Sequence, residues 1–208
     1  MGDGATDRAV MGRWVVGLTG GIGAGKSAAA ALLAERGAVV VDCDQLGRDV
    51  AEPAGAAYPG IVAHFGPGVV GPDGRLDRAA LAAIVFSDAH ALDDLNAITH
   101  PAIDAEIAAR IGAVPPGSLV VLDMAVLVET ALGAGLYSEV LVIESPMPAR
   151  LERLRAQRQM AAGDVAARIA SQATDSERRA VADHLIVNDG DPAQLRAALE
   201  SWLAHRWS

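Results

Sequence analysis

The chain has 208 residues, of which 26 are acidic and 17 are basic, so its formal net charge at pH 7 is −9. A surface that follows a nucleic-acid backbone needs a net positive face, and this charge therefore argues against a general nucleic-acid-binding protein. Cys43 is the only cysteine, and the five histidines lack the spacing of metal ligands. These facts exclude a disulfide framework and a structural zinc site, and they fit a reducing compartment.

No apolar run reaches the roughly 20 residues that a membrane helix needs. Residues 1–12 contain Asp3 and Asp7 and have no apolar segment, so we expect a flexible N-terminal tail there rather than a signal peptide. We expect a cytoplasmic protein without a membrane partner, in which residues 13–208 form one domain.

The most informative stretch is a glycine-rich octet that follows an apolar run. Residues 14–16, WVV, predict a strand, and residues 20–27 match the pattern G-x-x-x-x-G-K-[ST] of a phosphate-binding loop. Residues 28–37 predict a helix that ends at Gly37. The alternative is a glycine-rich turn that contains GKS by chance, but a strand before the octet and a helix after it favour the phosphate-binding loop.

The residue types of this loop suit the binding of a polyphosphate. Glycines leave backbone N–H groups uncovered, and the helix that follows adds the positive end of its dipole. Lys26, the only lysine in the chain, can reach the β- and γ-phosphate oxygens, and the Ser27 hydroxyl can ligate Mg²⁺. The residues that we predict to bind the nucleotide here are Gly21, Ile22, Gly23, Ala24, Gly25, Lys26 and Ser27.

A second strand is predicted at residues 38–41, followed by Asp42, Cys43 and Asp44. Ligands of open α/β sheets bind beyond the carboxyl ends of the strands, which would place both carboxylates at the working edge. Alternation along the strand would put Asp42 and Asp44 on one face and a packed Cys43 on the other. The alternative is that one or both aspartates cap the helix that follows.

Residues 51–114 interrupt the alternation of strands and helices, and they predict a helical insertion that holds the second substrate. Residues 52–60 and 64–77 are rich in Pro and Gly and predict turns. Three helices are predicted after them, at residues 78–87, 89–99 and 102–113, with His100 and Pro101 between the last two.

The remaining segments predict a return to a parallel sheet. Strands are expected at residues 119–123, 140–143 and 184–187, and a final helix at 192–207 has Pro192 in its first turn. Asp123 ends the first of these strands in the manner of a Walker B carboxylate near the metal, although any buried strand can end in Asp. The fold class that follows is an α/β P-loop NTPase core of three layers, α/β/α, comprising residues 13–50, 115–149 and 180–208.

Four arginines within nine positions follow the strand at 140–143, namely Arg150, Arg153, Arg155 and Arg158. They lie in a segment, residues 150–179, that predicts a helical lid. We expect Arg153 and Arg158 to contact the transferring phosphate when the lid closes. For Arg150 and Arg155 we favour a solvated helix face.

Taken together, these motifs make the chain resemble the dephospho-coenzyme A kinase family. The matching stretches are GLTGGIGAGKS at 17–27, VDCDQLGRDV at 41–50, LDRAALAAIVF at 76–86, LNAITHPAI at 95–103, AVLVE at 125–129 and ARIASQATDSERRAVADHLIVNDG at 167–190. One departure is Ala125, where the family usually has proline.

The resemblance implies ATP-dependent phosphorylation of the ribose 3′-hydroxyl of dephospho-coenzyme A, the last step of coenzyme A synthesis, with Mg²⁺ as cofactor. Asp44 would be the catalytic carboxylate, with Lys26 and the lid residue Arg158 as the other catalytic groups. Asn188 would lie against adenine. The residues implied in binding the coenzyme substrate are Thr19, Asp44, Arg48, His100, Leu127 and Glu129. The fold implied has a P-loop core, a helical coenzyme-binding insertion and a lid.

Two other functions compete with this interpretation. Another small-molecule P-loop kinase would share the core, and the insertion with its His100–Pro101 segment argues against it. A guanine-nucleotide switch needs Asn-Lys-x-Asp, which a chain with a single lysine at position 26 does not contain. We expect a monomer or a weak homo-oligomer.

Overall fold

The computed structural model describes residues 10–130, 132–158, 165, 168–189 and 191–205. The chain divides into two compact units: a core unit of residues 1–42 and 111–208, and a helical unit of residues 43–110. The helical unit thus begins before residue 51, the predicted start of the insertion. Of the predicted tail, residues 1–9 lie outside the described part, and Val10 pairs with Arg13 in a tight turn.

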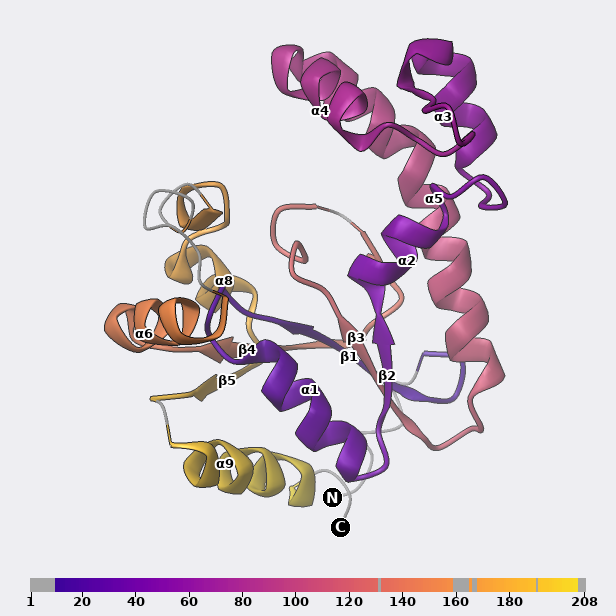
Figure 1. The fold of residues 1–208 in the computed structure, drawn as a ribbon. Helices are drawn as coiled ribbons and strands as arrows, with labels where there is room; N and C mark the ends of the chain where they lie inside the picture. The colour runs from indigo at the N-terminus through magenta and orange to yellow at the C-terminus, as the bar shows by residue number, and fades with distance from the viewer. Residues whose placement is uncertain (1–9, 131, 159–164, 166–167, 190, 206–208) are drawn as a thin grey trace. The chain divides into compact units, whose positions relative to one another are not determined.

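The core unit is built on a five-stranded parallel sheet with the strand order β2-β3-β1-β4-β5 (Figure 1). The strands are β1 (Trp14–Thr19), β2 (Val39–Asp42), β3 (Leu119–Asp123), β4 (Glu139–Glu144) and β5 (His184–Val187). This sheet confirms the predicted α/β fold. Because β1 is central, the loop that follows it emerges in the middle of the carboxyl edge, where such sheets bind ligands.

Four helices of the core unit are α1 (Lys26–Glu35), α6 (Met147–Arg158), α8 (Asp175–Val181) and α9 (Pro192–Ala204). Helices α1 and α9 pack on one face of the sheet, where Leu33 and Leu199 join strand residues such as Val16 and Leu18 in the core. Gly17 faces the other side, where an added Cβ would lie 2.6 Å from Leu127 Cδ1. Alternate residues of β1 therefore pack on opposite faces of the sheet.

The ends of α1 and α9 follow the predicted capping signals. Gly37, with φ +90°, follows the last turn of α1, a conformation that glycine adopts without a steric penalty. The Asp191 side chain accepts a hydrogen bond from Ala193 N (2.8 Å), and Pro192 occupies the first turn of α9.

The helical unit contains α2 (Cys43–Asp49), α3 (Tyr58–Phe65), the 3₁₀ turn η2 (Pro67–Val69) and α4 (Arg78–Ser87), together with most of α5 (Ala89–Ala113). Helix α4 has the predicted bounds, and Asp77 caps it by accepting from Ala79 N and Ala80 N. Helix α3 lies partly within the stretch predicted as turns, so that prediction is wrong there. Its Pro59 falls in the first turn, where a missing N–H costs nothing.

Helix α5 also corrects the sequence prediction, because residues 89–99 and 102–113 are one 25-residue helix with Pro101 inside it. Proline removes one backbone hydrogen bond, but it does not end a helix that packing supports. Ile103, Ile107 and Ile111 recur every four residues and are buried, which keeps the helix continuous. None of the helices in the described ranges combines the length and the apolarity that crossing a bilayer requires.

Candidate active site

The loop between β1 and α1 is held so closely that several of its positions require glycine. A Cβ at Gly20 would lie 2.5 Å from the backbone oxygen of Ile143, and Gly25, with φ +100°, adopts the left-handed conformation at the N-cap of α1. Side chains would collide or be strained at these positions. The loop can therefore present its backbone to an anion at the start of α1.

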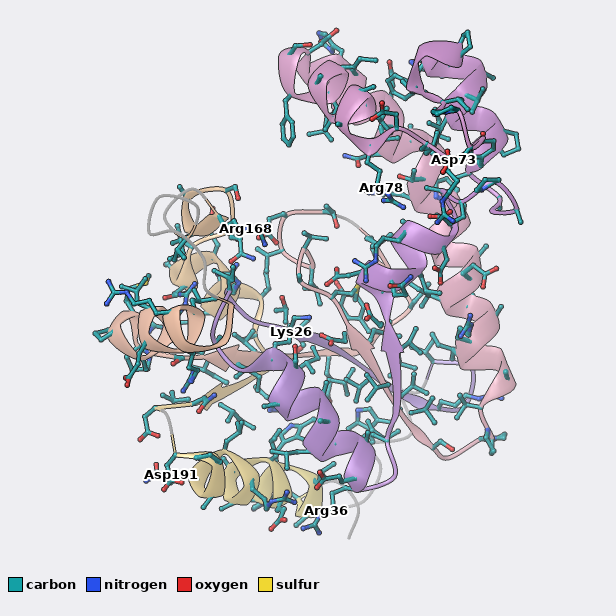
Figure 2. All side chains as sticks on the ribbon, viewed as in Figure 1. Lys26, Arg36, Asp73, Arg78, Arg168 and Asp191 are labelled. Atoms are coloured by element: carbon teal, nitrogen blue, oxygen red, sulfur yellow. The ribbon has the colours of Figure 1, made fainter. Side chains whose placement is uncertain are left out.

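Lys26 begins α1, as labelled in Figure 2, and its ammonium group forms an ion pair with the Asp123 carboxylate at the end of β3. Both side chains are largely buried, with exposed fractions of 15% and 14%. The parallel pairing of β1 with β3, in which Leu18 is the register partner of Asp123, brings the two together. The ion pair thus joins the start of α1 to the end of β3 at the carboxyl edge of the sheet.

A divalent cation could be held by oxygen atoms at this edge. Ser27 is exposed in the first turn of α1, and Asp123 supplies a carboxylate. The described residues contain no group of three or more His, Cys, Asp or Glu side chains that could hold a metal. A hydroxyl and one carboxylate fit Mg²⁺, which keeps several waters and completes its shell with nucleotide phosphates.

Arg150 corrects the prediction of a solvated side chain. It is 3% exposed, its Nε donates to Ile22 O (2.9 Å) and its Nη1 donates to the Asp175 carboxylate (3.1 Å). Arg155, one of the two arginines expected in solvent, is exposed. The spacing of Arg150 and Arg153 by three residues could have indicated that both lie on one face of α6.

Arg153 and Asn188 lie against the outer side of the loop. Arg153 Nη1 donates to Gly23 O (2.9 Å), and Asn188 Nδ2 donates to Ala24 O (2.9 Å). The side chain of Arg158 lies outside the described part of the structure. The phosphate contacts predicted for the two arginines, and the adenine contact predicted for Asn188, stay predictions.

Three predicted substrate residues lie on or near β1 and in the segment after β3. Thr19, the last residue of β1, is fully buried, and within the described part its Oγ1 has no hydrogen-bond partner. Leu127 is buried against Gly17. Glu129 Oε1 accepts from Ala173 N (2.7 Å) and lies 3.5 Å from Arg178 Nη2.

Arg178 lies in α8 and is almost fully buried beside two carboxylates. Burial lowers the pKa of its guanidinium, and the charges of Glu129 and Asp175 oppose that shift. Nearby, Gln172 Oε1 accepts a hydrogen bond from Ile22 N (2.8 Å). The segment from Gln172 to Arg178 therefore contacts both the phosphate-binding loop and the chain after β3, a role that sequence reasoning missed for Gln172.

The position predicted for Asp44 also requires correction. Strand β2 ends at Asp42 and α2 begins at Cys43, so strand alternation does not extend to Asp44. Asp44 is instead in the first turn of α2, where a carboxylate is favoured by the helix dipole. The buried Cys43 fits the predicted packed thiol.

Asp44 shares one face of α2 with two residues that follow it in the helix. Asp44, Gly47 and Arg48 are at positions i, i+3 and i+4, which share a face of a helix. Arg48 is exposed and its Nε donates to Gln45 Oε1 (2.9 Å). His100, the other predicted coenzyme contact, is half-buried in α5.

A pocket of about 300 Å³ lies within the helical unit, and α2, α3, α4 and α5 all contribute to its lining. Gly47 lines it from the same face of α2 as Asp44, and Leu81, Val85 and Ile103 make most of it apolar. Arg78, labelled in Figure 2, adds a cation that also lies 3.2 Å from Glu52. The volume and the apolar lining with few polar groups are typical of a small-molecule site.

Known proteins resemble this chain over nearly its whole length. The family profile described as Dephospho-CoA kinase matches residues 14–194. A dephospho-CoA kinase of Frankia casuarinae is 46% identical over 187 residues, covering 90% of this chain and 81% of the relative. A dephospho-CoA kinase of Mycolicibacterium paratuberculosis is also 46% identical, over 188 residues and 90% of this chain, but the chain spans only 46% of that relative's length.

A solved structure has the same fold. The crystal structure of TT1252 from Thermus thermophilus superposes with a TM-score of 0.80 at 33% identity, covering 93% of this chain and 97% of the other. The profile match extends from β1 into α9, and it includes the loop with Lys26, the helix with Asp44 and the strand that ends at Asp123. The chain therefore belongs to the dephospho-CoA kinase family.

Proposed function

We propose that the chain transfers the γ-phosphoryl group of ATP to the ribose 3′-hydroxyl of dephospho-coenzyme A, which yields coenzyme A and ADP as the last step of coenzyme A synthesis. The observation that supports it best is the pairing of Lys26 at the start of α1 with Asp123 at the end of β3, in a chain of this family. We further expect a cytoplasmic monomer or weak homo-oligomer.

The core unit would hold the phosphate donor. Residues 20–27 provide backbone N–H groups and the Lys26 ammonium, which neutralise charge on the β- and γ-phosphates. Ser27 and Asp123 would hold Mg²⁺, which supplies further charge neutralisation when bound. Arg158 would add a positive charge from the lid.

Asp44 would act as the general base. As the 3′-oxygen attacks the γ-phosphorus, its hydroxyl proton passes to the Asp44 carboxylate. The new O–P bond forms while the bond from the γ-phosphorus to the β,γ-bridging oxygen breaks, and ADP leaves. The position of Asp44 in the first turn of α2, on the same face as Gly47 and Arg48, supports this role.

The remaining predicted residues would bind the acceptor. Arg48 and His100 of the helical unit supply positive charge and a hydrogen-bonding ring, and we assign Thr19, Leu127 and Glu129 to the same substrate. The apolar pocket beyond Gly47 would take the uncharged arm of the acceptor, since Gly47 shares a face of α2 with Asp44.

A direct assay tests this function. The purified chain is incubated with ATP, Mg²⁺ and dephospho-coenzyme A, and the product is identified by mass spectrometry as the 3′-phosphorylated coenzyme. Nucleoside monophosphates and pantetheine serve as competing acceptors, and Lys26→Ala serves as the inactive control, with an expected loss on the order of 10² or more. ADP release that depends on another acceptor, with none from dephospho-coenzyme A, overturns the proposal.

A further inference from the structure

The backbone of the phosphate-binding loop is fixed from outside by two side chains. We infer that Arg153 and Asn188 are positioning residues that set the shape of this loop, rather than groups that touch the transferring phosphate or the adenine base. The inference rests on the proposed function to the extent that the loop must hold the phosphates of ATP.

The hydrogen bonds of Arg153 engage both of its terminal nitrogens. Nη1 donates to Gly23 O (2.9 Å) and to Ser145 Oγ (3.0 Å). Nη2 donates to Asn188 O (3.2 Å) and Asn188 Oδ1 (3.1 Å). Hydrogen bonds from a charged guanidinium to neutral acceptors are stronger than neutral ones. Movement of Arg153 toward a phosphate would break this set.

Asn188 is engaged in the same way and is only 6% exposed. Its Nδ2 donates to Ala24 O (2.9 Å), its Oδ1 accepts from Arg153, and its backbone N donates to Glu144 O (2.7 Å). A Cβ at Gly25 would lie 2.2 Å from Asn188 Nδ2, so the amide packs directly against the loop. Both the nitrogen and the oxygen of the Asn188 side-chain amide thus form hydrogen bonds within the protein.

Fixing a carbonyl also fixes the N–H of the same peptide. In a trans peptide the two groups point in opposite directions. Holding Ala24 C=O against Asn188 therefore directs the Gly25 N–H to the opposite side of the peptide. Holding Gly23 C=O against Arg153 orients the Ala24 N–H, which donates to Gly21 O (2.9 Å) and closes the turn. A loop shaped before the nucleotide binds loses little entropy on binding.

The test compares phosphate ligands that carry a purine base with one that does not. The equilibrium affinities of Arg153→Gln, Arg153→Lys and Asn188→Ala for ATP, GTP, ADP and inorganic tripolyphosphate are measured in Mg²⁺ together with kcat. We expect each variant to weaken all four ligands by a similar factor, about five- to fifty-fold for the loss of one or two hydrogen bonds. Arg153→Lys should lose less than Arg153→Gln, because the lysine ammonium keeps the positive charge and can still donate hydrogen bonds. Arg155→Gln, exposed on the same helix, is the control and should match the parent.

A double variant provides an independent check. Because Arg153 and Asn188 bond to each other and to adjacent peptides of the loop, Arg153→Gln combined with Asn188→Ala should cost little more than the worse single change. A change that only lowers stability would lower the melting temperature without weakening tripolyphosphate binding by folded protein at low temperature.

Three results would overturn the inference. One is an Asn188→Ala variant that alters the preference for ATP over GTP while tripolyphosphate binds as before, because that identifies a base contact. Another is an Arg153→Gln variant that loses kcat but keeps its affinity for ADP and tripolyphosphate, because that identifies a phosphate clamp. The third is unchanged affinity for all four ligands. Failure of the proposed function looks different: the parent itself then binds no ATP, or transfers no phosphate to dephospho-coenzyme A.

Discussion

Asp44 lies in the first turn of α2, and its proposed role is to accept a proton. Removing its charge while keeping its shape should leave the phosphate-binding loop intact. We expect Asp44→Asn to lower kcat by roughly 10²–10⁴, the usual contribution of a general base, with little change in ATP affinity. Steady-state kinetics combined with ATP titration measure the two effects separately. The control is Asp49→Asn, which changes an exposed carboxylate on the same helix. If the kcat of Asp44→Asn stays within threefold of the parent value, the assignment of Asp44 as the general base is wrong.

Glu144, at the end of β4, is a carboxylate whose pairing makes stability depend on pH. Arg179 Nε donates a hydrogen bond to Glu144 Oε2 (2.6 Å). This hydrogen bond is the main reason that the pKa of Glu144 lies below its usual value. Burial raises the pKa, and the charges of Arg179 and Arg150 lower it further. Because the folded-state pKa is lower than the unfolded one, the pair stabilises the fold above the unfolded pKa of about 4.3. That contribution is lost as pH falls through the folded pKa.

We therefore expect Arg179→Gln to lower the melting temperature by a few degrees at pH 7, since the pair is partly exposed. The difference from the parent should shrink below about pH 4.3 and vanish once Glu144 is protonated in both proteins. Thermal unfolding followed from pH 7 to pH 3 measures it. A difference that stays constant over this range would show that Arg179 acts through packing instead.

Single residues differ in how far the sequence predicts them. The positions of Lys26 and Ser27 at the start of a helix, and of Asp123 at the end of a strand, could be predicted because the glycine-rich octet and the apolar runs mark them locally. Arg150 could not, because its burial depends on Asp175 and on the Ile22 carbonyl, which are distant in sequence. Asn188 was identified as a site residue only through family resemblance, and its hydrogen bond to Ala24 needed the structure.

At the scale of elements, strands and capped helices were predicted more accurately than junctions. The bounds of β3, α4 and β5 match the prediction, because apolar runs and an Asp N-cap mark their ends locally. The errors are the break in α5, the missing α3 and the strand continued through Asp44. In α3 and α5 a proline suggested a turn or a break, and burial of Ile61 and Ile107 outweighed that local preference.

The helices of the helical unit line a pocket, and filling it tests where the acceptor binds. Ala82 lines the pocket from α4, whereas its neighbour Ala83 is exposed and is not among the lining residues. We expect Ala82→Phe to raise the KM for dephospho-coenzyme A about ten-fold or more, because the added ring occupies space needed by the apolar arm. The KM for ATP should not change. Ala83→Phe adds the same ring toward solvent and should leave both values unchanged; an equal effect of the two variants contradicts the pocket assignment.

At the scale of the whole molecule, the proposed donor site lies in the core unit, whereas the proposed acceptor groups lie in both units. The loop with Lys26 belongs to the core unit, as do Thr19, Leu127 and Glu129, and Asp44, Arg48 and the pocket belong to the helical unit. Binding a ligand slows the opening of the segments that it contacts, so amide hydrogen exchange can be assigned to each substrate separately.

ADP with Mg²⁺ should therefore slow exchange at residues 20–27 and in the first turns of α6, because Arg150 and Arg153 fix the loop from that helix. Dephospho-coenzyme A alone should slow exchange in α2 and in the segments of α4 and α5 that line the pocket. Exchange followed by mass spectrometry with each ligand and with both measures this division. Ala82→Phe should lose the protection by dephospho-coenzyme A and keep that by ADP. Protection by dephospho-coenzyme A confined to the core unit would place the acceptor arm outside the pocket, because the lining residues would then exchange as in the free protein.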